Sequence, residues 1–169
     1  MHKSVSHAPF STSVMEMTKI SLVAALYVVV TAWLAVFSFG AIQLRLSEMF
    51  NYLALYNKRY VFAITAGVVI ANFMSPTWML DVPIGGTATF LVLIFCRLVT
   101  KRIKNEPMKI AVTAIIFAVS MFTVAGQLAI VLDLPFFYTW LTVGLGELLS
   151  MTVGGILIYF VGKKIDLSR

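Results

Sequence analysis

The residues best suited to chemistry lie in one short stretch, AIQLRLSEMFNYLALYN. Within an almost continuously apolar chain, this stretch gathers five polar residues: Gln43, Arg45, Ser47, Glu48 and Asn51. A carboxylate accepts paired N–H donors, an amide donates and accepts, and a guanidinium can orient both. These groups suit the binding of a small polar molecule. The alternative is an ion pair between Arg45 and Glu48 that only pins the segment in place.

Three other acids are expected toward the same side of the molecule: Asp81, Asp133 and Glu147. Asp133 precedes LPFF and is expected to end a helix or form a turn. For Asp81, a turn role and a ligand role are equally open. Glu147 lies about two turns inside the last apolar run, where a carboxylate cannot easily reach solvent. Because ionisable groups inside apolar helices are costly, Glu147 is expected to face a cavity.

An amide and several aromatic residues complete the candidate set. Asn72 either makes a hydrogen bond between helices or reads a ligand. Trp78 and Trp140 either stack on a ring or belong to the interfacial aromatic belt. Such a set suits a flat, polar, neutral or cationic heterocycle. The candidate substrate-binding residues are Gln43, Arg45, Glu48, Asn72, Trp78, Asp81, Trp140 and Glu147.

Several classes of activity find no support in the sequence. It contains no GxSxG, HExxH or Walker A pattern, so we predict that the chain is not an enzyme and cannot hydrolyse ATP itself. Cys96 lies alone in an apolar run, and His2 and His7 lie in the N-terminal tail, so neither a metal nor a cofactor is expected. Nucleic-acid binding is disfavoured, because the basic residues form short clusters between apolar runs.

The elements that must position these residues are membrane helices. The chain has 169 residues, of which 60% are hydrophobic and 12% charged, whereas soluble domains carry about 25% charged residues. Five long apolar runs are candidates to cross the membrane: Ile20–Phe39, Tyr60–Ser75, Ile84–Thr100, Ile110–Leu132 and Tyr138–Val161. A sixth segment, Leu46–Tyr56, is helical in pattern but only about 15 Å long at 1.5 Å per residue.

Charge placement predicts the topology. With six crossing segments and both termini in the cytoplasm, the lysines and arginines of the loops and tails fall inside, and only Arg45 falls outside. We therefore predict an all-α, six-helix membrane bundle forming a single domain over residues 1–169. Its cytoplasmic tails are residues 1–18 and 163–169, and its bundle is residues 19–162. The segment Gly40–Ser47 is expected to fold into the outer end of the bundle as a wall of the site.

Four motifs, in order, carry a resemblance to a known family: IQLRLSE, IANF, LDVPIGGTATFL and VGLGELL. The chain resembles the queuosine-precursor S-components of energy-coupling factor (ECF) transporters. The resemblance implies a six-helix protein of the bacterial plasma membrane that binds 7-deazaguanine bases or queuine near its outer face. It also implies partners, namely a transmembrane coupling subunit and two ABC ATPases that use ATP and Mg²⁺, and a toppling motion during uptake. Docking on these partner subunits is expected through Ser21, Ala25 and Ala32, although Val28 interrupts this row of small residues.

The implied ligand suggests roles for the candidate residues. Glu48 or Glu147 would accept the N1–H and the exocyclic amine of a deazaguanine, and Asp81 would meet the aminomethyl cation of one precursor. Asn72 or Gln43 would bond the O6 or pyrrole edge, and Trp78 or Trp140 would stack on the ring. The alternatives are an S-component for another nucleobase or vitamin, a structural or assembly membrane protein without a ligand, and, less favoured, a small membrane enzyme.

Overall fold

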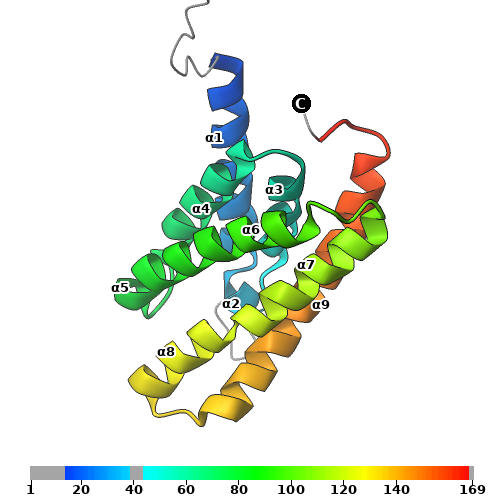
Figure 1. The fold of residues 1–169 in the computed structure, drawn as a ribbon. Coiled ribbons are helices and arrows are strands. Elements are labelled where there is room, and N and C mark those ends of the chain that lie inside the picture. The colour runs from blue at the N-terminus through cyan, green and yellow to red at the C-terminus, as the bar shows by residue number, and fades with distance from the viewer. Residues whose placement is uncertain (1–13, 39–43, 168–169) are drawn as a thin grey trace, which may run out of the picture.

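The computed structural model describes residues 14–38 and 44–167, and all the regular structure in these residues is helical (Figure 1). The predicted all-α class is therefore confirmed for this part of the chain. The elements, in order, are α1 (Val14–Trp33), α2 (Ala35–Ser38), η1 (Leu46–Tyr52), α3 (Leu53–Tyr56), α4 (Arg59–Asn72), α5 (Trp78–Leu80), η2 (Asp81–Gly85), α6 (Gly86–Thr100), α7 (Glu106–Ser120), α8 (Phe122–Leu132) and α9 (Phe136–Gly162).

Four helical stretches of the described chain are long and apolar enough to cross a membrane. They are Val14–Trp33, Trp78–Thr100, Glu106–Leu132 and Phe136–Gly162. The apolar helix α4 has 14 residues, about half of the 27 in α9. Together these five stretches correspond to the five apolar runs of the sequence. The chain is thus a multi-pass membrane protein, while the count of six crossing segments stays a prediction.

The stretch Trp78–Thr100 is interrupted near its beginning, and the stretch Glu106–Leu132 ends at Asp133. Between α5 and α6 the chain forms a π-helical turn, η2, which contains Pro83. Proline lacks the N–H that an α-helix needs, so a wider turn accommodates it and re-aims the side chains around it. Asp133 ends α8 with a left-handed backbone (φ 53°), which confirms its predicted turn role.

The segment Leu46–Tyr56 is helical, as predicted, but its first seven residues form a 3₁₀-helix. A 3₁₀-helix rises about 2.0 Å per residue, so the segment spans about 20 Å instead of the about 15 Å expected for a regular α-helix. Most of its side chains are buried, and it packs between α1 and α9. A short polar segment therefore lies in the interior of the bundle.

Two glycines of α9 allow this close packing. A Cβ atom added at Gly154 would collide with the side chain of Met49 and would lie 2.7 Å from its Cα. A Cβ atom at Gly155 would lie 3.0 Å from the hydroxyl of Tyr52. That hydroxyl donates a hydrogen bond of 2.9 Å to the carbonyl of Met151. The Gly-Gly pair thus lets α9 approach the backbone of η1.

Replacing Gly154 by alanine is expected to destabilise the protein by about 1–3 kcal/mol, because the added methyl group meets backbone that cannot move aside. The measurement is thermal unfolding in detergent. Gly126→Ala is the matched control, since its Cβ would meet nothing closer than Phe136 at 3.9 Å. Equal melting temperatures for the two variants would contradict the tight packing of α9 on η1.

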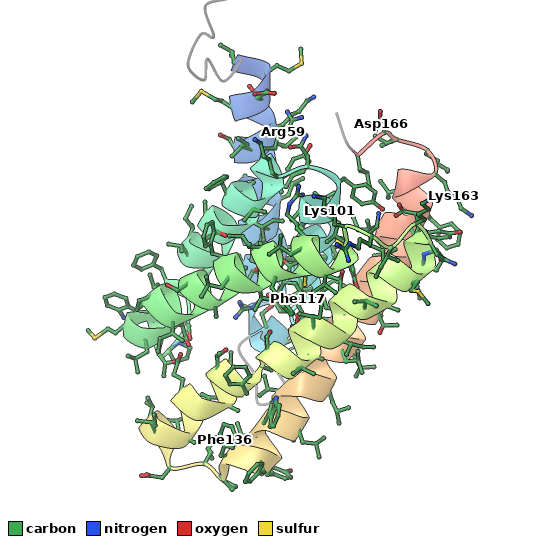
Figure 2. All side chains as sticks on the ribbon, viewed as in Figure 1. Arg59, Lys101, Phe117, Phe136, Lys163 and Asp166 are labelled. Carbon is green, nitrogen blue, oxygen red and sulfur yellow. The ribbon has the colours of Figure 1, made fainter. Side chains whose placement is uncertain are left out.

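The two ends of the bundle differ in charge. Figure 1 shows that α1 begins, and α9 ends, at the same end of the molecule, while the turn between α8 and α9 lies at the other. Arg59, Lys101 and Lys163 lie toward the first end and Phe136 at the second (Figure 2). This arrangement agrees with the basic clusters expected at one face. The assignment of that face to the cytoplasm stays a prediction.

Candidate functional site

A partly enclosed cavity of about 70 Å³ lies among η1, α4, η2, α6, α7, α8 and α9. Phe117, near the middle of the molecule in Figure 2, contributes to its wall. The polar side chains in the lining are Arg45, Glu48, Asn72, Asp81, Thr89, Ser120, Thr123, Gln127 and Glu147.

Five of the eight predicted site residues line this one cavity, although they come from separate parts of the chain. They are Arg45, Glu48, Asn72, Asp81 and Glu147. Gln43 lies outside the described residues, as does the segment 40–43 that was expected to form a wall of the site. Of the rest of that segment, Ser47 is buried and Arg45 is largely so. A role for any of these residues in binding stays a prediction at this point.

The two tryptophans do not join this group. Trp78 is 42% exposed and its ring packs on Phe73 at a centroid distance of 5.8 Å. The indole of Trp140 donates a hydrogen bond of 3.1 Å to the carbonyl of Val119, on an apolar groove between α7 and α9. Both positions suit the interfacial belt that was the alternative for these residues.

Glu48 is held by donors of the protein itself. The Tyr27 hydroxyl donates to its Oε1 at 2.6 Å, and the Asn51 amide donates to its Oε2. The Arg45 guanidinium lies 3.8 Å from the same Oε1. Both oxygens of this carboxylate therefore have partners, and the ion pair expected as an alternative is present.

The position of η1 is fixed by hydrogen bonds from α1. The Thr31 hydroxyl donates to the carbonyl of Tyr27 at 2.9 Å and lies 2.6 Å from the Ser47 hydroxyl. Because Thr31 uses its only proton on that carbonyl, Ser47 must be the donor between the two hydroxyls. Tyr27 and Thr31 are one turn apart on the buried face of α1, so this face holds both Ser47 and Glu48 in place.

Asn72 links three segments around the cavity. Its Oδ1 accepts a hydrogen bond of 3.2 Å from Arg45, and its Nδ2 donates one of 2.7 Å to the backbone carbonyl of Asp81. A Cβ atom added at Gly85 would lie 2.5 Å from that Nδ2. The glycine in the VPIGG sequence thus leaves room for the amide, and the expected hydrogen bond between helical segments is made.

The Asp81 carboxylate is surrounded by neutral donors. Its Oδ2 accepts from the hydroxyls of Ser75 and Thr77, the latter at 2.7 Å. Its Oδ1 accepts from the amide of Gln127 on α8. Sequence analysis missed Gln127, yet it is the one amide in the apolar sequence FTVAGQLAIVL. An amide alone in an apolar helix is the signal that could have identified it.

Three hydroxyl residues of the lining were also missed: Thr89, Ser120 and Thr123. The Ser120 hydroxyl donates to the carbonyl of Phe117 at 2.7 Å, and that of Thr123 to the carbonyl of Ser120 at 3.0 Å. Such bonds to the preceding turn are common in apolar helices and leave the oxygen able to accept. Their sequence signal is therefore weak.

Glu147 differs from the other two acids. It is 3% exposed and lies on α9 against the cavity. Its Oε1 is buried and has no hydrogen-bond partner among the residues that the structure describes. An unsatisfied buried acceptor costs about 1–3 kcal/mol, and more when it is charged. This oxygen is therefore available to a donor that enters the cavity.

The comparisons with known proteins agree with this picture of a membrane protein. The sequence profile described as "QueT transporter" matches residues 17–163. The chain is 42% identical over 163 residues to a protein of Lactococcus lactis subsp. cremoris named "Queuosine precursor transporter QueT", covering 91% of this chain and 96% of that protein. No solved structure matches the chain. The profile match spans most of the chain, from α1 to the end of α9, and on this ground the chain belongs to the QueT family of transporters.

Proposed function

We propose that the cavity binds a queuosine precursor, a 7-deazaguanine base or queuine, for uptake across the membrane. The observation that carries this proposal is the buried, unpartnered Oε1 of Glu147 in a cavity lined by polar groups. A 7-deazaguanine presents N1–H and an exocyclic amine side by side, and a carboxylate accepts such a donor pair. The name of the Lactococcus relative supports the same class of ligand.

The hydrogen bonds divide the roles of the acids. Glu48 has partners at both oxygens and the cation of Arg45 beside it, so it would organise the site, while Glu147 would accept from the donor edge of the base. Phe117, which is 2% exposed and lines the cavity, would supply an apolar wall for the ring in place of the expected tryptophans. The hydroxyls of Ser120 and Thr123 donate their protons to backbone carbonyls, so their oxygens would accept the pyrrole N–H of the base.

We also propose that the chain works as the substrate-binding S-component of an ECF-type ABC importer. It would deliver its substrate by reorienting on a transmembrane coupling subunit driven by two ATPases that use ATP and Mg²⁺. Two observations support this: the sequence lacks an ATP-binding motif, and Ser21, Ala25 and Ala32 are exposed on α1. Small exposed residues allow another membrane helix to approach closely. Both termini would lie in the cytoplasm of a bacterial cell.

The first experiment is a calorimetric titration of the purified protein with 7-aminomethyl-7-deazaguanine, 7-cyano-7-deazaguanine, queuine and guanine. Calorimetry is the direct measurement because none of the three tryptophans, at positions 33, 78 and 140, lines the cavity. Saturable binding of a deazaguanine or queuine, with guanine weaker, is the expected result. A folded sample that binds none of the four would overturn the proposed ligand and favour another base or vitamin.

Coupling to ATPases is tested by uptake of labelled precursor in cells that make the chain with or without the coupling subunit and ATPases. Uptake only with the full set is expected. Uptake by the chain alone would contradict the S-component proposal and leave the ligand proposal standing. A ligand-free assembly role has less support, because it requires a fully paired polar cluster, and Glu147 Oε1 is unpaired among the described residues.

A further inference from the structure

The charges that line the cavity do not balance. Three acids, Glu48, Asp81 and Glu147, face it together with one arginine, Arg45. Arg45 lies 3.8 Å from Glu48. The other salt bridges of the described residues, Arg59–Glu16 and Lys109–Glu106, involve no residue of the cavity lining. Within the described chain, Asp81 and Glu147 therefore have no salt-bridge partner.

A metal ion does not explain this excess of acids. Among the residues that the structure describes, no group of three or more histidines, cysteines, aspartates or glutamates is arranged to hold one. The donors around Asp81 are two hydroxyls and an amide, which orient its carboxylate but do not cancel its charge. A partly buried carboxylate without a counter-charge is costly in an apolar bundle. A cation on the ligand would remove that cost.

We propose that the cavity selects a ligand with one positive charge, whose ammonium group binds at Asp81 while its paired N–H donors bind at Glu147. The proposal rests on the proposed function, and among the queuosine precursors it favours the aminomethyl base over the uncharged cyano base. Asp81 is partly exposed, so an ammonium beside it keeps some of its water, whereas Glu147 is buried and suits a neutral donor edge. Asp81 is thus the specificity-determining acid of the site.

The surroundings of Asp81 fit this task. Ser75 and Thr77, in the connection after α4, hold one carboxylate oxygen, and Gln127 from α8 holds the other. The carboxylate is thus fixed from two sides of the cavity. The amide of Gln127 also brings its own carbonyl, a further acceptor for an ammonium group. Gln127 is a positioning residue for this cation site.

The test compares two ligands that differ in charge at one substituent, 7-aminomethyl- and 7-cyano-7-deazaguanine. Both are titrated calorimetrically into the wild type, Asp81→Asn and Asp133→Asn. The amide introduced by Asp81→Asn would keep the hydrogen bonds, because the hydroxyls of Ser75 and Thr77 can accept as well as donate. Asp133→Asn is the matched control: it removes an exposed acid that does not line the cavity, at a left-handed position that asparagine tolerates.

The wild type is expected to bind the aminomethyl base at least about tenfold more tightly than the cyano base. Asp81→Asn is expected to weaken aminomethyl binding by about 10- to 100-fold and cyano binding by less than about threefold. Asp133→Asn should change neither. Equal affinities in the wild type, or an equal loss of both ligands in Asp81→Asn, would overturn the cation site while sparing the proposed function. If neither ligand binds the folded wild type, the proposed function itself fails.

Discussion

Replacing Glu147 by glutamine is expected to weaken deazaguanine binding by about 100-fold or more, because two charge-assisted hydrogen bonds are lost and the new amide donates toward donors. The same change should not lower the melting temperature of the empty protein. It keeps a buried polar atom without a partner in the described structure but removes the negative charge of the carboxylate, and an unpartnered neutral group costs less than a charged one. Calorimetry and thermal unfolding of the same sample measure both effects.

The matched comparison for this experiment is Glu48→Gln, at the other glutamate of the cavity. Glu48 accepts from Tyr27 and Asn51, so its replacement should lower the melting temperature and affect the ligand less than Glu147→Gln does. Glu147→Gln is thus expected to lose more affinity for the ligand, and Glu48→Gln is expected to lose more thermal stability. If Glu48→Gln loses more affinity than Glu147→Gln, the division of roles between the two glutamates is wrong.

Replacing Arg45 by methionine is expected to destabilise the protein by about 3–5 kcal/mol, because it leaves the buried carboxylate of Glu48 without its cation. The variant also loses the hydrogen bond from Arg45 to Asn72, which in turn holds the backbone at Asp81. The melting temperature in detergent measures the loss. Arg59→Met is the control, since Arg59 pairs with Glu16, whose side chain is about half exposed, far from the cavity.

The double variant Arg45→Met with Glu48→Gln separates charge from packing. If the uncompensated carboxylate causes the loss, the double variant should be more stable than Arg45→Met alone, although it carries one more substitution. A double variant less stable than either single one would show instead that the shape of Arg45 and its bond to Asn72 matter more than its charge.

The overall fold could largely be predicted from the sequence, because apolar runs that are long enough to cross a bilayer leave few alternatives to helices. Even the short segment Leu46–Tyr56 was expected to be helical. Its 3₁₀ geometry was not expected, and neither was its close packing against α9 at Gly154 and Gly155. The sequence alone does not say which helix lies opposite those glycines.

The site could be predicted in part, for a similar reason. Acids and amides such as Glu48, Asn72 and Glu147 stand out in apolar segments, so their common location was foreseeable. Gln127 was missed although it carries the same signal. The tryptophans were placed in the candidate set by residue type alone, and residue type does not say which way an indole points. Which carboxylate has a free oxygen depends on Tyr27 and Asn51, and only the structure reveals these partners.

The unequal helices have a consequence for the surrounding lipid. At 1.5 Å per residue, α4 is about 21 Å long and α9 about 40 Å, while the hydrocarbon core of a bilayer is about 30 Å thick. A flat bilayer that both helices cross cannot match both lengths, so the membrane would have to thin beside α4 and α9 would have to tilt. Hydrophobic mismatch is thus built into the protein, and the acyl-chain length of its host membrane becomes one of the terms that set its stability.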